Sequence, residues 1–202
     1  MSPRIVVFVS GNGSNLQAIL DACESGQLDA QVTGVVSNRR KAFGLVRAER
    51  AGVDRLYFPL APFKKRGASR ADYDAALARA VADFQPDLIV LAGWMHILSP
   101  AFLAGVSCPV LNLHPALPGA FPGTRAIERA LDAAREGDLD HTGVMVHHVV
   151  PEVDAGPVVA TRVVPIAPDD TLEALSTRMH AAEHTLLVDA ISKTLHPPRS
   201  TP

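Results

Sequence analysis

The sequence predicts an α/β fold: an open, mostly parallel twisted sheet with helices on both faces and antiparallel strands in its C-terminal part. Over the first half of the chain, short apolar runs alternate with segments of helical periodicity. Strands separated by helices in this way pair in parallel through right-handed crossovers. Toward the C-terminus, two β-rich runs follow one another with only a loop between them, which favours antiparallel pairing.

The first half carries clear start signals for its elements. The run "IVVFV" from Ile5 is continuously apolar, which is typical of a strand covered on both faces. Ser69 and Asp72 form a capping-box pattern before an alanine-rich helix, and Ser99 followed by Pro100 is typical of a helix start. The expected elements are strands at residues 5–9, 32–36, 56–58, 88–91 and 110–113, helices at residues 16–23, 43–51 and 73–84, and a short helix from residue 100.

The regular alternation ends at Pro115. Three prolines and two glycines between residues 115 and 123 predict a structured loop. The last helix is expected to be capped by Asp170, with Glu173 three residues further on. The expected elements are a helix at residues 126–135, strands at residues 144–149 and 158–164, and a final helix from about residue 171 to residue 195.

Length and composition indicate one folded domain. The chain has 202 residues and a formal net charge of −2, so no basic field suggests nucleic acid. We expect a single domain over residues 1–195, with an N-terminal half to about residue 110 and a C-terminal half from about residue 111, and a disordered tail at 196–202. Cys23 and Cys108 are too few for a disulfide framework, and no apolar run is long enough to span a membrane. These features predict a cytoplasmic protein.

The segment "SGNGSNL", residues 10–16, lies between the first expected strand and helix. Backbone N–H groups at such a helix start favour an anion. Gly11 and Gly13 permit close approach, and Ser14 and Asn15 can add donors. Leu16 stands where dinucleotide-binding loops need a third glycine, and the lysine of nucleoside triphosphate loops is absent. The segment therefore suits a monophosphate, unless its serine and asparagine only cap the helix.

A second alternative is an NADP-binding reductase. The segment "SNRRK", residues 37–41, lies where such enzymes place an arginine for the 2′-phosphate. The missing third glycine counts against this interpretation.

Polar side chains interrupt the expected strand "VLNLHP" near its end. Asn112 and His114 are two residues apart and so point to one face, and ligands of open α/β sheets bind beyond the carboxyl ends of the strands. Asp154, in "PEVDAGP", follows another β-rich run and could meet them. An amide, an imidazole and a carboxylate suit acid–base and oxyanion chemistry. The carboxylate is expected to raise the pKa of the imidazole.

A zinc site is a further hypothesis for the last helix. His180, Glu183 and His184 match the pattern of inverted zinc peptidases, but a hydrolytic zinc needs a third ligand and little chain remains to supply it. We therefore expect no metal. Among the other histidines, His147 is notable because strand alternation places it on the opposite face from His148.

Together the motifs resemble those of the glycinamide ribonucleotide formyltransferase family. "SGNGSNL", "LAGWMHILSP", "NLHPALPGAFPG" and "PEVDAGP" occur in the order and approximate spacing of that family, and the resemblance spans Ile5 to about Leu195. It implies a Rossmann-like formyltransferase fold. Arg125 and Met145 depart from the bacterial pattern, and "HPALPGAFPG" looks closer to the fungal form.

The resemblance also implies a role for each matched residue. Asn112, His114 and Asp154 look like the catalytic trio. The residues implied for the ribonucleotide are Gly13, Ser14 and Asn15 at the phosphate and Glu183 at the ribose. The implied folate-binding residues are Arg70, Met95, His96, Ile97, Leu98, Asn112, Val150, Pro151, Glu152, Val153 and Asp154.

The implied reaction moves a formyl group from the co-substrate 10-formyltetrahydrofolate to the amine of 5′-phosphoribosylglycinamide, in purine biosynthesis. Protonated His114 and the Asn112 amide would stabilise the oxyanion, and Asp154 would keep His114 charged. The nearest alternatives are a formyltetrahydrofolate hydrolase, a formyltransferase for another amine and a catalytically inactive folate-binding protein. A monomer or homodimer with small-molecule substrates is expected, without nucleic acid or membrane partners.

Overall fold

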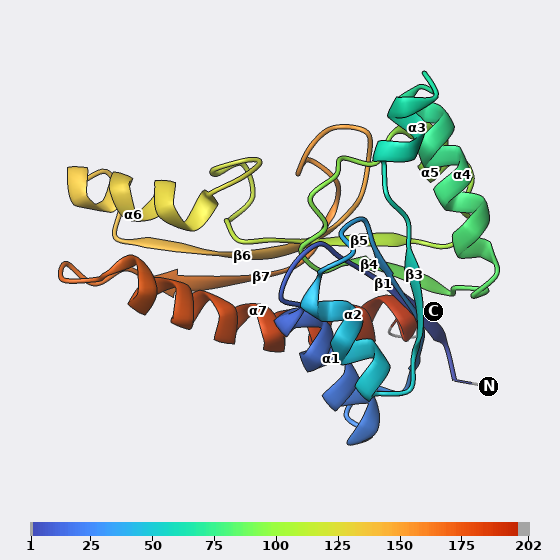
Figure 1. Ribbon diagram of the computed structural model, residues 1–202. Helices are drawn as coiled ribbons and strands as arrows, with labels where there is room; N and C mark the ends of the chain where they lie inside the picture. Colours follow the sequence, from blue (N-terminus) through green and yellow to red (C-terminus); the bar gives the residue numbers. More distant parts are fainter. Residues whose placement is uncertain (1, 198–202) are drawn as a thin grey trace, which may run out of the picture. The chain divides into compact units, whose positions relative to one another are not determined.

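The computed structural model describes residues 2–197 and contains a seven-stranded sheet of order β3-β2-β1-β4-β5-β6-β7 (Figure 1). The chain divides into two compact units, residues 1–111 and 112–202, with the boundary inside β5. The strands are β1 (Arg4–Val9), β2 (Gln31–Ser37), β3 (Asp54–Tyr57), β4 (Leu88–Leu91), β5 (Val110–His114), β6 (His141–His148) and β7 (Val158–Pro165). The helices are α1 (Ser14–Glu24), α2 (Phe43–Arg50), α3 (Ala61–Lys65), α4 (Arg70–Ala82), α5 (Pro100–Leu103), α6 (Ala126–Glu136) and α7 (Leu172–Leu195).

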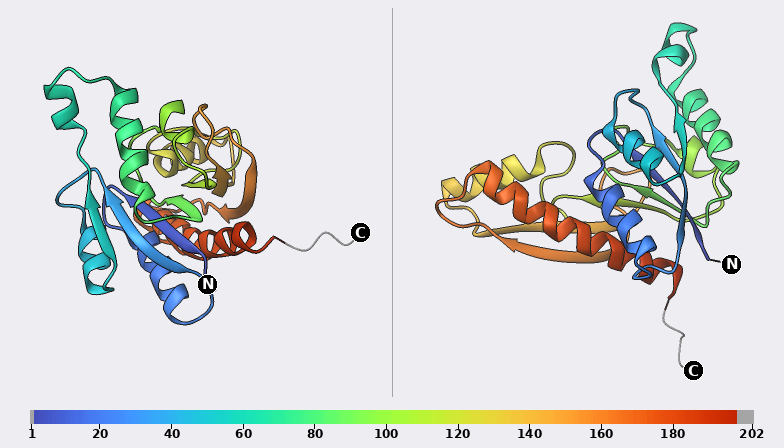
Figure 2. Two further views of the ribbon diagram at one scale, coloured as in Figure 1. Left: turned by 90° about the vertical axis from the view of Figure 1, so that its right-hand side faces the viewer. Right: turned by 60° about the horizontal axis from the view of Figure 1, so that its bottom comes forward.

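The first unit is built on parallel strands. β1 pairs in parallel with β2 and β4, and β2 pairs in parallel with β3, which confirms the predicted parallel sheet. Helices α1 and α2 lie on one face of these strands and α3 to α5 on the other (Figure 1, Figure 2). Because both faces are covered, β1 is buried from Ile5 to Val9, as its unbroken apolar run predicted.

Two elements of the first unit differ from the expectation. β3 spans Asp54–Tyr57 rather than residues 56–58. Helix α3 was not predicted, because its five residues are too few to show helical periodicity. Pro62 in its first turn is the one local signal of a helix start.

Helix α4 begins with the predicted capping box. The Ser69 hydroxyl accepts from the Asp72 N–H at 3.1 Å, and the Asp72 carboxylate accepts from the Ser69 N–H at 2.8 Å. The variant Ser69→Ala is expected to lose about 1 kcal/mol of unfolding free energy, because one N–H of the first turn loses its acceptor. Urea unfolding measures this loss, and Ser25→Ala, which removes only a 3.3 Å bond to the Ala22 carbonyl, is the control. An unchanged midpoint for Ser69→Ala would contradict the account.

The second unit contains the predicted antiparallel pair. β6 and β7 pair from His141 opposite Pro165 to His147 opposite Val158. Helix α7 packs along both strands, and α6 contacts β6 and α7.

The N-terminal cap of α7 is Thr171, so the expectation that Asp170 caps this helix is wrong. The Thr171 hydroxyl accepts from the Ala174 N–H at 3.1 Å. The Asp170 carboxylate instead accepts from the Ala167 N–H at 2.8 Å and pairs with Arg178. At the other end of α7, His196 donates its N–H to the Ser192 carbonyl. Of the tail expected to be disordered, residues 198–202 lie outside the described residues.

None of the helices within residues 2–197 is both long enough and apolar enough to cross a bilayer.

Candidate active site

Three side chains of the second unit meet at the end of β5. The Asn112 amide nitrogen lies 3.2 Å from Asp154 Oδ1, and His114 Nδ1 lies 3.4 Å from Asp154 Oδ2. Asp154 Oδ2 also accepts from the Gly123 N–H at 2.9 Å. The structure therefore brings together the amide, imidazole and carboxylate singled out in the sequence. His114 is only 4% exposed, so these contacts form in a largely desolvated environment.

His147 is a fourth member of this cluster and was not among the residues predicted for the site. Its Nδ1 lies 2.9 Å from the His148 carbonyl, and a carbonyl only accepts, so Nδ1 carries a proton. In the neutral ring Nε2 is therefore the acceptor for the Asn112 amide, at 3.1 Å. Nε2 also lies 3.6 Å from Asp154 Oδ1. The sequence signal for His147 was strand alternation, which placed it on the opposite face from His148.

The loop after β5 supplies a partner to the other His114 nitrogen. His114 Nε2 donates to the Phe121 carbonyl at 3.1 Å. The Arg129 guanidinium donates to the carbonyls of Phe121 and Pro122, both at 2.7 Å. The backbone of Phe121 has φ of +46°, a conformation that costs energy in a bulky residue and is maintained by such contacts.

Burial decides the proton affinity of His114. It is the largest effect and lowers the pKa of the imidazole, whereas the Asp154 carboxylate and the Phe121 carbonyl raise it. The net pKa of His114 lies below its ordinary value. The expectation of a net rise is wrong, because desolvation of a nearly buried ring disfavours its charged form more than one carboxylate favours it.

Asp154 remains ionised at neutral pH. Burial is again the largest single effect and raises the pKa of the carboxyl group. The His147 side chain, the Gly123 N–H and the charge that His114 carries when it is protonated together outweigh burial, so the net pKa of Asp154 is lowered. A carboxylate is therefore available beside His114 Nδ1.

The lowered pKa of His114 gives a prediction for an NMR titration of its ring protons. The midpoint should fall below that of an ordinary histidine, and Asp154→Asn should move it lower still, because the variant removes an effect that raises the pKa. The pKa of His114 is lower in the folded protein than in the unfolded chain. Its neutral ring therefore contributes to the free energy of unfolding above the ordinary histidine pKa, and this contribution is lost as the pH falls below that value. A midpoint that rises in Asp154→Asn would contradict the assignment.

The glycine loop, defined as residues 10–13, joins β1 to α1 in the first unit. Gly13 is the N-terminal cap residue of α1 and has a left-handed backbone with φ of +75°. The cap residue is therefore a glycine, which has no side chain to accept a hydrogen bond from the N–H groups of the first turn. Ser14 and Asn15 are the first two residues of α1, where N–H groups attract anions.

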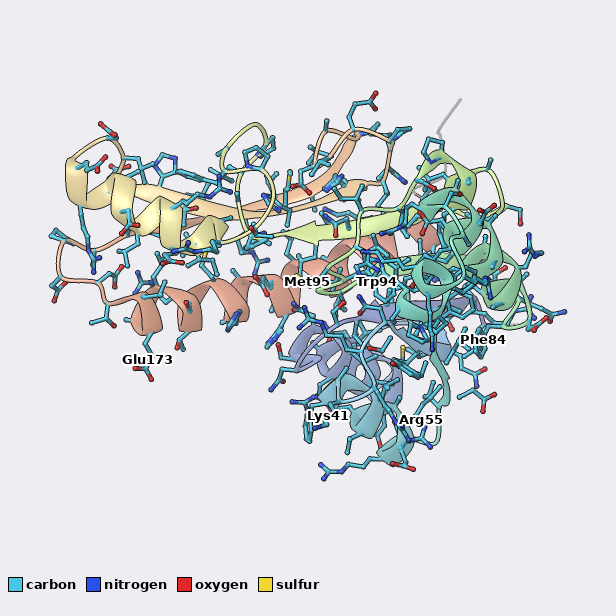
Figure 3. All side chains as sticks on the ribbon, turned by 45° about the horizontal axis from the view of Figure 1, so that its top comes forward. Lys41, Arg55, Phe84, Trp94, Met95 and Glu173 are labelled. Atoms are coloured by element: carbon cyan, nitrogen blue, oxygen red, sulfur yellow. The ribbon has the colours of Figure 1, made fainter. Side chains whose placement is uncertain are left out.

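The segment after β4 combines exposed and buried residues. Met95 and Ile97 are 59% and 65% exposed, whereas Leu98 is buried. Figure 3 shows Met95 beside the buried Trp94 in this segment. The His96 ring lies 2.9 Å from the Asn38 amide nitrogen, and burial is the largest of the effects that lower its pKa. The exposed apolar side chains make this segment available to a ligand.

Arg70 forms a hydrogen bond with the segment that follows β4. Its guanidinium donates to the Ile97 carbonyl and lies 3.0 Å from Asp74 Oδ2. Asp74 is fully buried and also accepts from the Ser99 N–H at 2.9 Å. Asp74 was not among the residues predicted for the site, although its position four residues after Arg70 in a helix was a usable signal.

The remaining candidates lie in the second unit. Val150 is half-buried, the three residues after it are exposed, and Val153 is 46% exposed. Glu183 is 5% exposed on α7. Within the described part of the chain, no group of three or more His, Cys, Asp and Glu side chains is arranged to hold a metal ion.

Comparison with known proteins identifies relatives along the whole chain. The family model described as formyl transferase matches residues 3–191. The phosphoribosylglycinamide formyltransferase of Schizosaccharomyces pombe is 50% identical over 199 residues, covering 95% of this chain and 96% of that protein. The Escherichia coli protein of the same name is 40% identical over 189 residues, covering 94% and 85%. The higher identity to the fungal protein agrees with the resemblance seen after His114.

A solved structure gives the same result for the fold. Glycinamide ribonucleotide transformylase 1 from Symbiobacterium toebii superposes with a TM-score of 0.88 at 40% identity, covering 96% of this chain and 88% of that one. The fold class expected from the sequence is confirmed.

Proposed function

Because the chain belongs to the formyl transferase family, we propose that it transfers the formyl group of 10-formyltetrahydrofolate to the amine of 5′-phosphoribosylglycinamide. The observation that carries this proposal is the largely buried cluster of Asn112, His114 and Asp154. It offers hydrogen-bond donors and a proton acceptor but no activated nucleophile, which suits direct transfer between two bound substrates. The product is the N-formyl amide, and tetrahydrofolate leaves.

The amine nitrogen attacks the formyl carbon and forms a tetrahedral oxyanion. The Nε2–H of His114, which donates to the Phe121 carbonyl at 3.1 Å in this structure, donates to the oxyanion in the reaction. The negative charge on that oxygen raises the pKa of His114, so the imidazolium is favoured in the transition state although burial disfavours it beforehand. Asp154, facing Nδ1 at 3.4 Å, stabilises that charge.

The Asn112 amide is the second donor to the oxyanion. Both of its N–H groups are used in this structure, one by His147 at 3.1 Å and one by Asp154 at 3.2 Å. We assign the longer bond, to Asp154, as the one exchanged for the oxyanion. The proton lost by the attacking amine passes by way of Asp154 and His114 to N10 of the folate as the carbon–nitrogen bond breaks. The charges before and after the transfer then balance.

The remaining residues bind the two substrates. The N–H groups at the start of α1 are assigned to the ribonucleotide phosphate, because anions are stabilised there and the cap residue is a glycine. Glu183 is assigned to the ribose hydroxyls. The residues assigned to ribonucleotide binding are Gly13, Ser14, Asn15 and Glu183. The residues assigned to folate binding are Arg70, Met95, His96, Ile97, Leu98, Asn112, Val150, Pro151, Glu152, Val153 and Asp154. Small-molecule substrates and a cytoplasmic location complete the proposal.

Deformylation of 10-formyltetrahydrofolate, followed by absorbance, tests the proposal. A transferase should consume the folate only when 5′-phosphoribosylglycinamide is present. Equal rates with and without this amine would indicate a hydrolase instead. Tight binding of NADPH without any deformylation would favour the reductase.

A further inference from the structure

The glycine loop is packed tightly against the first turn of α2. The Gly11 carbonyl accepts from the Gly44 N–H at 3.1 Å. A Cβ on Gly13 would lie 2.8 Å from the Gly44 Cα, and a Cβ on Gly44 would lie 2.7 Å from Val9 Cγ2. Only glycine fits at both positions, so the loop and α2 approach each other at backbone distance.

The side chain of Arg47, one turn along α2, forms hydrogen bonds with the same loop. Its Nε donates to the Asn12 carbonyl at 3.0 Å, and one terminal nitrogen donates to the Asn12 side-chain carbonyl at 2.9 Å. The other terminal nitrogen donates to Gln17 Oε1 at 3.0 Å. The guanidinium lies over the Phe43 ring, 4.9 Å from its centroid. All three guanidinium nitrogens therefore have partners within the protein, and the group is held in one orientation.

These contacts determine which way the loop N–H groups point. In a trans peptide the C=O and the following N–H point in opposite directions. Because the carbonyls of Gly11 and Asn12 are both directed toward α2, the N–H groups of Asn12 and Gly13 are directed away from it. Successive N–H groups on one side form an anion-binding concavity.

We propose that Arg47 is a positioning residue for the substrate phosphate. It fixes the Asn12–Gly13 peptide so that the Gly13 N–H is presented to the phosphate, and its guanidinium acts through Asn12 rather than by contacting the phosphate. This inference rests on the assignment of the phosphate to the start of α1.

The test compares three variants. Arg47→Gln removes the charge and the pair of hydrogen bonds to Asn12. Arg47→Lys keeps the charge but cannot form both bonds with one planar group. Arg50→Gln is the matched control: Arg50 also lies over the Phe43 ring, at 5.6 Å, and none of the described hydrogen bonds joins it to the loop. Both Arg47 variants are expected to raise the KM for 5′-phosphoribosylglycinamide about tenfold. The KM for 10-formyltetrahydrofolate and kcat should be unchanged, and Arg50→Gln should behave as wild type.

A dephosphorylated substrate separates a phosphate effect from a general one. The ratio of kcat/KM for the ribonucleotide to kcat/KM for glycinamide ribonucleoside should fall in both Arg47 variants. Wild-type KM values in Arg47→Lys would overturn the proposal, because charge alone would then suffice. Equal losses with both substrates would also overturn it, since the effect would not involve the phosphate.

A Ser14→Asp variant distinguishes this inference from the phosphate site on which it rests. A carboxylate in the first turn of α1 should repel the phosphate and raise the KM for the ribonucleotide strongly. If Ser14→Asp has no effect, the phosphate site itself is wrong. If Ser14→Asp raises KM but the Arg47 variants do not, the site stands and the role of Arg47 is wrong.

Discussion

Replacing His114 with alanine is expected to lower kcat by about a hundredfold or more, the typical effect of removing one oxyanion donor. The variant loses the Nε2–H that the reaction directs at the formyl oxygen, and it loses the ring that Asp154 faces at 3.4 Å. Steady-state deformylation with both substrates saturating measures the effect on kcat directly. Circular dichroism establishes that the variant is folded.

His141→Ala is the matched control for this variant. His141 lies in β6 and also pairs with a carboxylate, Asp140, at 2.7 Å, but its side chain is 51% exposed. Its replacement should leave kcat unchanged. If His114→Ala were folded and retained near wild-type turnover, the proposed mechanism would be wrong.

Replacing Asp154 with asparagine is expected to have a comparable effect on kcat, about a hundredfold or more. Asparagine has the same shape as aspartate and can still accept a hydrogen bond from the Gly123 N–H. A lower kcat in this variant is therefore caused by the missing negative charge. Without the carboxylate the pKa of His114 falls further, and the imidazolium becomes harder to form in the transition state.

This cause predicts a pH dependence for the Asp154→Asn defect. The loss of kcat should be smallest at the acid end of the profile, where protons are abundant, and should increase as the pH rises. Asp140→Asn, which neutralises the carboxylate of the exposed pair with His141, should show no such dependence. A defect in Asp154→Asn that is constant with pH would contradict an electrostatic role for this residue.

Much of the fold could be predicted because local signals and tertiary packing agree. The continuous apolar run from Ile5 predicts a strand that is buried on both faces, and Ser69 with Asp72 predicts a helix start. Each of these signals depends only on residues that are close together in the sequence. Strand alternation likewise placed Asn112 and His114 on one face. The short helix α3 lacked such a signal, and the cap of α7 shifted by one residue because Asp170 pairs with Arg178.

The missed features of the site depend on contacts between distant segments. His147 meets Asn112 across 35 positions of sequence, and Arg47 meets Asn12 across the same separation. The periodicity of apolar residues does not reveal which distant side chains make contact with one another. The sign of the pKa shift of His114 was wrong for the same reason, since its burial depends on packing around the end of β5 that the sequence does not display.

The measurement that tests the central claim most directly follows the formyl carbon itself. The protein is incubated with 10-formyltetrahydrofolate labelled with an isotope at that carbon and with unlabelled 5′-phosphoribosylglycinamide, and the products are identified by mass spectrometry. The account predicts that the label appears in the N-formyl amide of the ribonucleotide, together with unlabelled tetrahydrofolate. Label recovered as formate, or remaining on the folate, would contradict it.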